Sequence, residues 1–164
     1  MVPYTISASD GIDLFVRDYS VKNSNTVLLF IHGLGEHSGR YLNFIQEFNI
    51  RNISIFTIDT RGHGRSEGKR GHSPFYGQLM SDIHSFVQHV ADKTPNQKHF
   101  LYGHSMGGNL VINYSLKNDK RINGIIASSP AIKPAIQPTK IKLILARLIQ
   151  KSIPTLRLNN GLDI

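Results

Sequence analysis

The stretch that decides the fold is residues 99–107, His99-Phe100-Leu101-Tyr102-Gly103-His104-Ser105-Met106-Gly107. Its first four residues form a short apolar run that predicts a buried strand, and residues 106–116 predict the helix that follows. Gly103 and Gly107 flank Ser105 and leave room for neighbouring backbone to approach closely. We therefore expect Ser105 to adopt a strained conformation that lifts its hydroxyl above the end of the strand.

On both sides of this turn, buried apolar runs alternate with segments of helical spacing. The predicted strands are Tyr4–Ser7, Ile12–Tyr19, Val27–Ile31, Ile53–Ile58, His99–Tyr102 and Ile122–Ser128. The predicted helices are Tyr41–Phe48, Phe75–Ala91 and Met106–Leu116, and the Gly-rich stretch 61–74 reads as a loop. Strands separated by helices indicate βαβ units with right-handed crossovers, and hence a mostly parallel sheet flanked by helices. The alternation in Ile12–Tyr19 favours an antiparallel edge strand.

The pattern changes after Ser129. Pro130, Pro134 and Pro138 recur every four residues and cannot continue a central strand. They lead into a basic, apolar segment, residues 140–153, that we expect to be helical. The sequence therefore divides into a core over residues 1–129 and a second, incomplete segment over residues 130–164.

The chain carries a formal net charge of +8. Residues 130–164 hold six basic residues against Asp163 alone, without the interleaved aromatic residues typical of single-strand nucleic-acid binders. We interpret the charge as a surface property and expect no nucleic-acid partner. On a helical wheel, Lys140, Arg147 and Lys151 lie opposite a broad apolar arc. Two interpretations stay open: a helix that touches an anionic membrane, or one that packs on the core with a solvated basic face.

The chain of 164 residues contains no cysteine, which excludes disulfides and mildly favours a reducing compartment. Its first residues lack the basic and apolar regions of a signal peptide, and no apolar run is long enough to span a bilayer. We expect a cytoplasmic protein, with peripheral membrane contact as the alternative. No zinc-binding H-E-x-x-H pattern is present, so we expect no metal and no other cofactor.

Three ordered motifs now carry a family resemblance: residues 32–41 (HGLGEHSGRY), 59–68 (DTRGHGRSEG) and 103–108 (GHSMGG). Together they resemble the monoacylglycerol lipases, which are lysophospholipase-like α/β-hydrolases grouped with the serine aminopeptidase domain. The resemblance implies an α/β-hydrolase fold, cut after about its sixth strand, with residues 130–164 as the start of a cap or lid. It also implies a serine esterase whose substrate is a small lipid ester, a monoacylglycerol or a similar lysolipid.

The resemblance assigns roles to individual residues. Ser105 is the expected nucleophile, and the backbone N–H groups of Leu34 and Met106 are the expected oxyanion-hole donors. Glu36 and Arg40 are expected to shape a polar pocket for the glycerol end of the substrate. The alternative for this pair is a solvated surface ion pair. Arg61 and His63 are expected to be structural members of their loop.

The remainder of a catalytic triad is not visible in the sequence. In α/β-hydrolases the serine is followed along the chain by an acid and then by a histidine. All eight histidines here precede Ser105, and the only carboxylates after it are Asp119 and Asp163. We expect the N-terminal part of an enzyme. The alternatives are a non-catalytic remnant or binding module, or a hydrolase with another substrate, such as an aminopeptidase or an acyltransferase.

Overall fold

The computed structural model describes residues 1–133 together with residues 139, 141, 144, 146 and 149. The chain forms two compact units, residues 1–131 and 132–164, and the sheet and its helices lie in the first. The helix expected over residues 140–153 lies mostly outside the described residues, so its contact with a membrane stays a prediction. None of the helices described is both long and apolar enough to cross a membrane.

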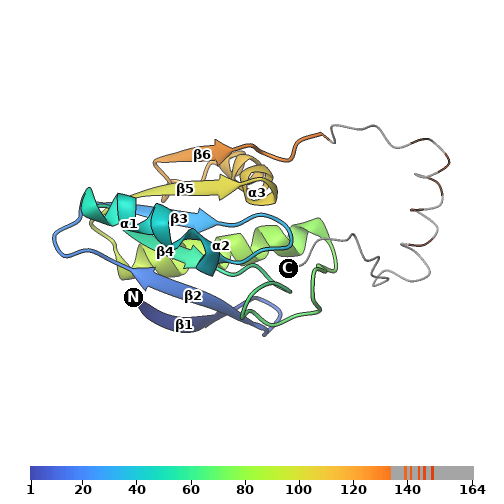
Figure 1. Cartoon of the computed structure of the whole chain (residues 1–164), viewed down its shortest axis with the longest axis horizontal. Coiled ribbons are helices and arrows are strands. Elements are labelled where there is room, and N and C mark those ends of the chain that lie inside the picture. Colours follow the sequence, from blue (N-terminus) through green and yellow to red (C-terminus); the bar gives the residue numbers. More distant parts are fainter. Residues whose placement is uncertain (134–138, 140, 142–143, 145, 147–148, 150–164) are drawn as a thin grey trace. The chain divides into compact units, whose positions relative to one another are not determined.

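The first unit is built on a six-stranded sheet with the order β1-β2-β4-β3-β5-β6 (Figure 1). The strands are β1 (Val2–Ser7), β2 (Asp13–Tyr19), β3 (Thr26–Ile31), β4 (Ser54–Ile58), β5 (Lys98–His104) and β6 (Gly124–Ser128). β4, β3, β5 and β6 run parallel, whereas β2 pairs antiparallel with both β1 and β4. The mostly parallel sheet is confirmed. The prediction that Ile12–Tyr19 forms an edge strand was wrong, because β1 covers its outer side and takes the edge position.

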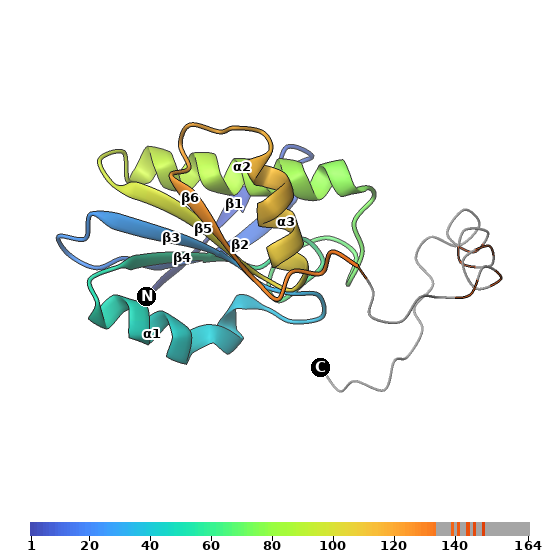
Figure 2. The ribbon, with the colours of Figure 1, turned by 90° about the horizontal axis from the view of Figure 1, so that it is seen from above.

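Helices cover both faces of this sheet (Figure 2). They are the 3₁₀ turn η1 (Ser38–Tyr41), α1 (Leu42–Ile50), α2 (Tyr76–Lys93) and α3 (Met106–Ser115). α1 lies on one face, and α2 and α3 lie on the other. The helix predicted from Tyr41 begins one residue later, because Tyr41 ends the 3₁₀ turn and its backbone angles, φ −104° and ψ 22°, are not helical.

The alternation of side chains along β3 divides the core between the two faces. Val27, Leu29 and Ile31 pack in the cluster that contains the apolar side chains of α2 and α3. Leu28 and Phe30 face the other way and pack with Ile45 and its neighbours on α1. A strand that buries both faces reads as a continuous apolar run, which is why this strand could be found from sequence.

The connections around β3 create a topological switch point at one end of the sheet. After β3 the chain crosses to form β4 on one side of β3, and after β4 it crosses back to form β5 on the other side. β3 and β5 are therefore parallel neighbours whose connections lead away toward opposite edges of the sheet. In open parallel sheets, ligands bind outside the carboxyl ends of the strands at such a switch point. The loop from His32 and the turn at Ser105 both leave the sheet there.

Candidate active site

Ser105 occupies the turn between β5 and α3 in a conformation that side chains rarely adopt. Its backbone angles are φ 53° and ψ −114°. Its N–H donates to the Ser128 carbonyl at 2.9 Å, and its carbonyl accepts from the N–H groups of Asn109 at 3.1 Å and Ala131 at 3.0 Å. These three hydrogen bonds hold the strained backbone of Ser105 against the end of β6, the first turn of α3 and the segment after β6. The strained turn predicted from the sequence is confirmed.

The two glycines of the turn are required by close backbone contacts. A Cβ atom on Gly103 would lie inside van der Waals distance of the Gly107 carbonyl. One on Gly107 would overlap the Ile31 carbonyl and lie 2.6 Å from the carbonyl oxygen of His32. The first turn of α3 thus packs directly on the backbone at the end of β3, which confirms the reason predicted for both glycines.

The loop after β3 reaches Ser105 through Gly33. A Cβ atom built on this buried glycine would lie 3.2 Å from the Ser105 Cβ atom. The next residue, Leu34, exposes 66% of its surface, whereas Met106 is partly buried against the core. The role predicted for their backbone N–H groups stays a prediction.

Glu36 turns inward, toward its own loop. Its Oε1 atom accepts the N–H of Gly33 and the hydroxyl of Tyr41, both at 2.6 Å. Burial alone would raise the pKa of Glu36, but the hydrogen bonds from Tyr41 and Gly33 outweigh burial and the pKa is lowered. Arg40 is exposed, and among the described residues no ion pair joins it to Glu36. The alternative of a surface ion pair is therefore wrong for the described structure.

His32, directly after β3, is completely buried and has a defined tautomer. Its Nε2 atom accepts the backbone N–H of Thr60 at 2.9 Å. A nitrogen that accepts carries no proton in the neutral ring, so Nδ1 is the protonated atom and donates to the Gly33 carbonyl at 2.7 Å. Burial lowers the pKa of His32 to about 4, which keeps the ring neutral at physiological pH.

The loop after β4 is anchored by buried charges. The Asp59 carboxylate accepts the Ser38 N–H at 2.8 Å, the Ser38 hydroxyl, the Arg65 N–H at 2.9 Å and the Arg17 guanidinium at 3.1 Å. Arg61 is 4% exposed and pairs with Asp82 on α2 and with Asp10. These contacts support a structural role for Arg61. Asp59 also ties the loop after β4 to η1, next to Glu36.

The hydroxyl of Ser105 has no hydrogen-bond partner among the described residues. No group of three potential metal ligands occurs in the described part of the chain.

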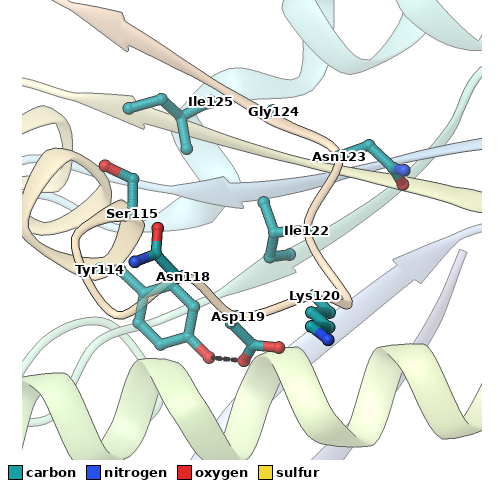
Figure 3. A pocket seen from close by; sticks show the side chains of 9 residues that line it. All are labelled: Tyr114, Ser115, Asn118, Asp119, Lys120, Ile122, Asn123, Gly124 and Ile125. Atoms are coloured by element: carbon teal, nitrogen blue, oxygen red, sulfur yellow. Dashed lines mark hydrogen bonds between the residues drawn. The ribbon is translucent and has the colours of Figure 1, made fainter.

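A hollow of about 330 Å³ lies at the other end of α3, lined by Tyr114, Asp119 and the start of β6 (Figure 3). The Asp119 oxygens there are engaged by Tyr114 and Arg121, and the hollow is separated from Ser105 by the length of the helix.

Sequence reasoning did not assign roles to His32, Tyr41 or Asp59. One signal was available for two of them: His32 and Asp59 are the polar residues that directly follow buried strands, at the edge of the sheet where sites form. No comparable signal existed for Tyr41. Its aromatic ring fits the apolar face of the following helix equally well, and only the structure shows where its hydroxyl lies.

Comparison with known proteins agrees with this geometry. The model of the serine aminopeptidase family matches residues 22–164. Human monoglyceride lipase is 32% identical over 96% of this chain, and monoacylglycerol lipase from Mycolicibacterium smegmatis is 30% identical over 82%. Among solved structures, the monoacylglycerol lipase of Paleococcus ferrophilus is 35% identical over 92% of this chain, with a TM-score of 0.76. A soluble variant of the Saccharomyces cerevisiae monoglyceride lipase gives a TM-score of 0.81 at 28% identity and covers 99% of this chain.

The match extends over only part of each relative. The chain spans 52% of the human enzyme, 48% of the Mycolicibacterium enzyme and 56% of each of the two solved lipases. The residues matched by the family model, 22–164, include the turn at Ser105 and the loop after β3.

Proposed function

Because the chain belongs to the serine aminopeptidase family of α/β-hydrolases, we propose that Ser105 is the nucleophile of a carboxylic ester hydrolase that acts on monoacylglycerols. One observation carries the proposal: the strained Ser105 at the turn from β5 to α3, with the Gly33 loop packed against it. Several relatives are monoglyceride lipases by name, which supports the choice of substrate.

The proposed reaction forms and then breaks an acyl-enzyme. The Ser105 oxygen attacks the ester carbonyl, the glycerol alkoxide leaves with a proton, and water then releases the fatty acid. In α/β-hydrolases the proton of the serine passes to a histidine that follows it along the chain. No histidine follows Ser105 in these 164 residues. We therefore expect turnover of a protein in which such a histidine follows the matched segment.

The backbone N–H groups of Leu34 and Met106 are the proposed donors to the oxyanion. Met106 is the first residue of α3, where the free N–H groups of a helix and its dipole favour negative charge. Leu34 follows the glycine that lies against Ser105. In a serine hydrolase, removal of one such donor typically costs a factor of about 10²–10³ in kcat.

Arg40 and Glu36 are the proposed polar groups for the glycerol end. Arg40 is exposed in the 3₁₀ turn η1, which precedes α1 and is close in sequence to the loop beside Ser105. Oε1 of Glu36 takes both internal hydrogen bonds, and Oε2 has no partner among the described residues. That oxygen is the one available to accept a substrate hydroxyl.

Hydrolysis of a monoacylglycerol and labelling by a fluorophosphonate test the proposal on the full-length protein. Such a probe reacts appreciably only with a serine that is activated by a base. Ser105→Ala should abolish labelling and lower turnover by about 10⁴-fold or more. Ser115→Ala, at the other end of α3, is the matched control and should change neither. Labelling that survives Ser105→Ala would exclude Ser105 as the nucleophile.

Assays with other substrates separate two alternatives, a hydrolase of the same family with another substrate and a binding protein without catalysis. An aminopeptidase would cleave an aminoacyl arylamide faster than an ester of similar reactivity. A non-catalytic binding protein would react with neither substrate and would not be labelled, although it would still bind the lipid.

A further inference from the structure

We propose that Glu36 is a positioning residue of the oxyanion hole: together with His32 it fixes two successive peptide groups, the second of which carries the Leu34 N–H. The inference rests on the proposed function and assigns to Glu36 a task that is independent of any contact with glycerol. It is carried by four hydrogen bonds and one close backbone contact around Gly33.

The first peptide group joins His32 to Gly33 and is held at both ends. Its carbonyl oxygen lies so close to α3 that a Cβ atom on Gly107 would be 2.6 Å from it. Its N–H donates to Oε1 of Glu36 at 2.6 Å. A hydrogen bond to a charged group is shorter and about twice as strong as one between neutral groups. The peptide plane therefore cannot rotate without losing a charge-assisted bond or striking the helix.

The second peptide group joins Gly33 to Leu34. Its carbonyl accepts Nδ1–H of His32 at 2.7 Å. The chain contains no cis peptide among its described bonds, and in a trans peptide the C=O and N–H groups point in opposite directions. Fixing the Gly33 carbonyl on His32 therefore fixes the direction of the Leu34 N–H. A hydrogen bond at the carbonyl also polarises the peptide and strengthens its N–H as a donor.

The side chains of Glu36 and His32 are themselves fixed by hydrogen bonds. The Tyr41 hydroxyl donates to the same Oε1 of Glu36, and the Thr60 N–H donates to Nε2 of His32. The Thr60 contact excludes the other neutral tautomer, which would turn Nδ1 from a donor into an acceptor facing a carbonyl. The hole is thus preorganised before substrate arrives, which is the condition under which such donors lower a barrier.

Kinetics on two substrates separate positioning from glycerol recognition. Glu36→Ala should lower kcat by about 10- to 100-fold on a monoacylglycerol and on a nitrophenyl ester, which has no glycerol, because both need the oxyanion hole. Glu36→Gln keeps an oxygen acceptor and should retain kcat on the nitrophenyl ester within about threefold. Tyr41→Phe should fall between them, and Glu47→Ala, an exposed carboxylate on α1, is the control. A loss in Glu36→Ala that is confined to the glycerol ester would overturn the proposal.

A second measurement does not depend on activity. With ¹⁵N-glycine labelling of the full-length protein, exchange of the Gly33 amide should speed up by about tenfold or more in Glu36→Ala and remain slow in Glu36→Gln. Unchanged exchange in Glu36→Ala would refute the clamp, whatever the kinetics. If the unaltered protein hydrolyses neither ester, the proposed function fails, and amide exchange alone then decides whether Glu36 holds the loop.

Discussion

The loops that leave β3 and β4 start side by side and are held by different forces. The first, residues 32–37, is fixed by a neutral imidazole and a half-buried carboxylate that bind its own peptide groups. The second, residues 59–72, is fixed by ion pairs of the buried Asp59 and Arg61 to β2, α2 and the segment before β2. Hydrogen bonds to a peptide set the direction of an N–H, whereas ion pairs between side chains set where a segment is attached. The comparison suggests that the first loop serves orientation and the second serves stability.

The largest effect should come from the buried charge in the second loop. Arg61→Ala leaves Asp82, which is 2% exposed, without its guanidinium partner. Burial raises the pKa of Asp82 even with Arg61 beside it, so the orphaned carboxylate would be unfavourable. Breaking one side of such a pair typically costs about 3–5 kcal/mol in the free energy of unfolding. Chemical denaturation measures this loss, and kcat of the protein that remains folded should stay within about twofold.

Arg51→Ala is the matched control, because its ion pair with Glu47 is exposed on both sides. It should cost no more than about 0.5 kcal/mol. Equal losses for the two arginines would show that the charges of the second loop do not anchor it. A large fall in kcat for Arg61→Ala would show that this loop also shapes the site.

Periodicity was sufficient to predict most of the fold, because a buried parallel strand and an amphipathic helix each leave a local pattern. The turn at Ser105 could also be predicted from a local pattern, because the glycines on either side of it indicate that neighbouring backbone approaches closely. The internal position of β2 could not, since it depends on which strand pairs with its far side. The partners of Glu36 were equally hidden. A carboxylate three residues after a glycine looks like a surface residue until the turn of the chain is known.

A second prediction concerns acid: as the pH falls, the contribution of His32 in the first loop to the free energy of unfolding should be lost before that of Asp59 in the second. The pKa of His32 is about 4 when folded, below the value of about 6.5 expected when unfolded, so the unfolded chain takes up the proton first. Its contribution is complete above pH 6.5 and is lost as the pH falls to 4, about 3 kcal/mol in all. The pKa of Asp59 is lowered despite burial by hydrogen bonds from Ser38 and Arg65, so its contribution is lost only below about pH 4.

Unfolding free energies measured from pH 7.5 to 4 test the contribution of His32, which is lost before that of Asp59. Burial also lowers the pKa values of His89 and His99. The pH dependence of the unaltered protein is therefore the sum of the contributions of all three histidines. His32→Asn removes one titrating group, and its stability should therefore fall less steeply with acid over this range. Parallel curves for the variant and the unaltered protein would mean that His32 does not titrate as its burial requires.

A third prediction compares two glycines within the second loop. Gly64 has φ +48°, and a Cβ atom there would strike the Asp59 carboxylate. Gly71 has φ +65° with no atom within 4 Å of the same position. Both alanine variants carry the cost of a left-handed conformation, about 1–2 kcal/mol, but only Gly64→Ala also displaces a hydrogen-bonded carboxylate. Thermal unfolding should therefore show a loss of about 2–3 kcal/mol for Gly64→Ala and about 1 kcal/mol for Gly71→Ala. Equal losses would mean that Asp59 moves aside at no cost.

The smallest effect concerns the joint between the two loops. Ser38 begins η1, just after the first loop, and its hydroxyl donates to Asp59 at the start of the second. Ser38→Ala removes this donor to a charged acceptor and also the oxygen that accepts from the Arg17 guanidinium, which keeps its pair with Asp59, and should cost about 1.5 kcal/mol. If the second loop supports the first through this joint, kcat on a nitrophenyl ester should also fall severalfold. Ser73→Ala, which removes an exposed hydrogen bond just after the second loop, should change neither quantity measurably. A loss of stability at unchanged kcat would show that the first loop holds its orientation without help from the second.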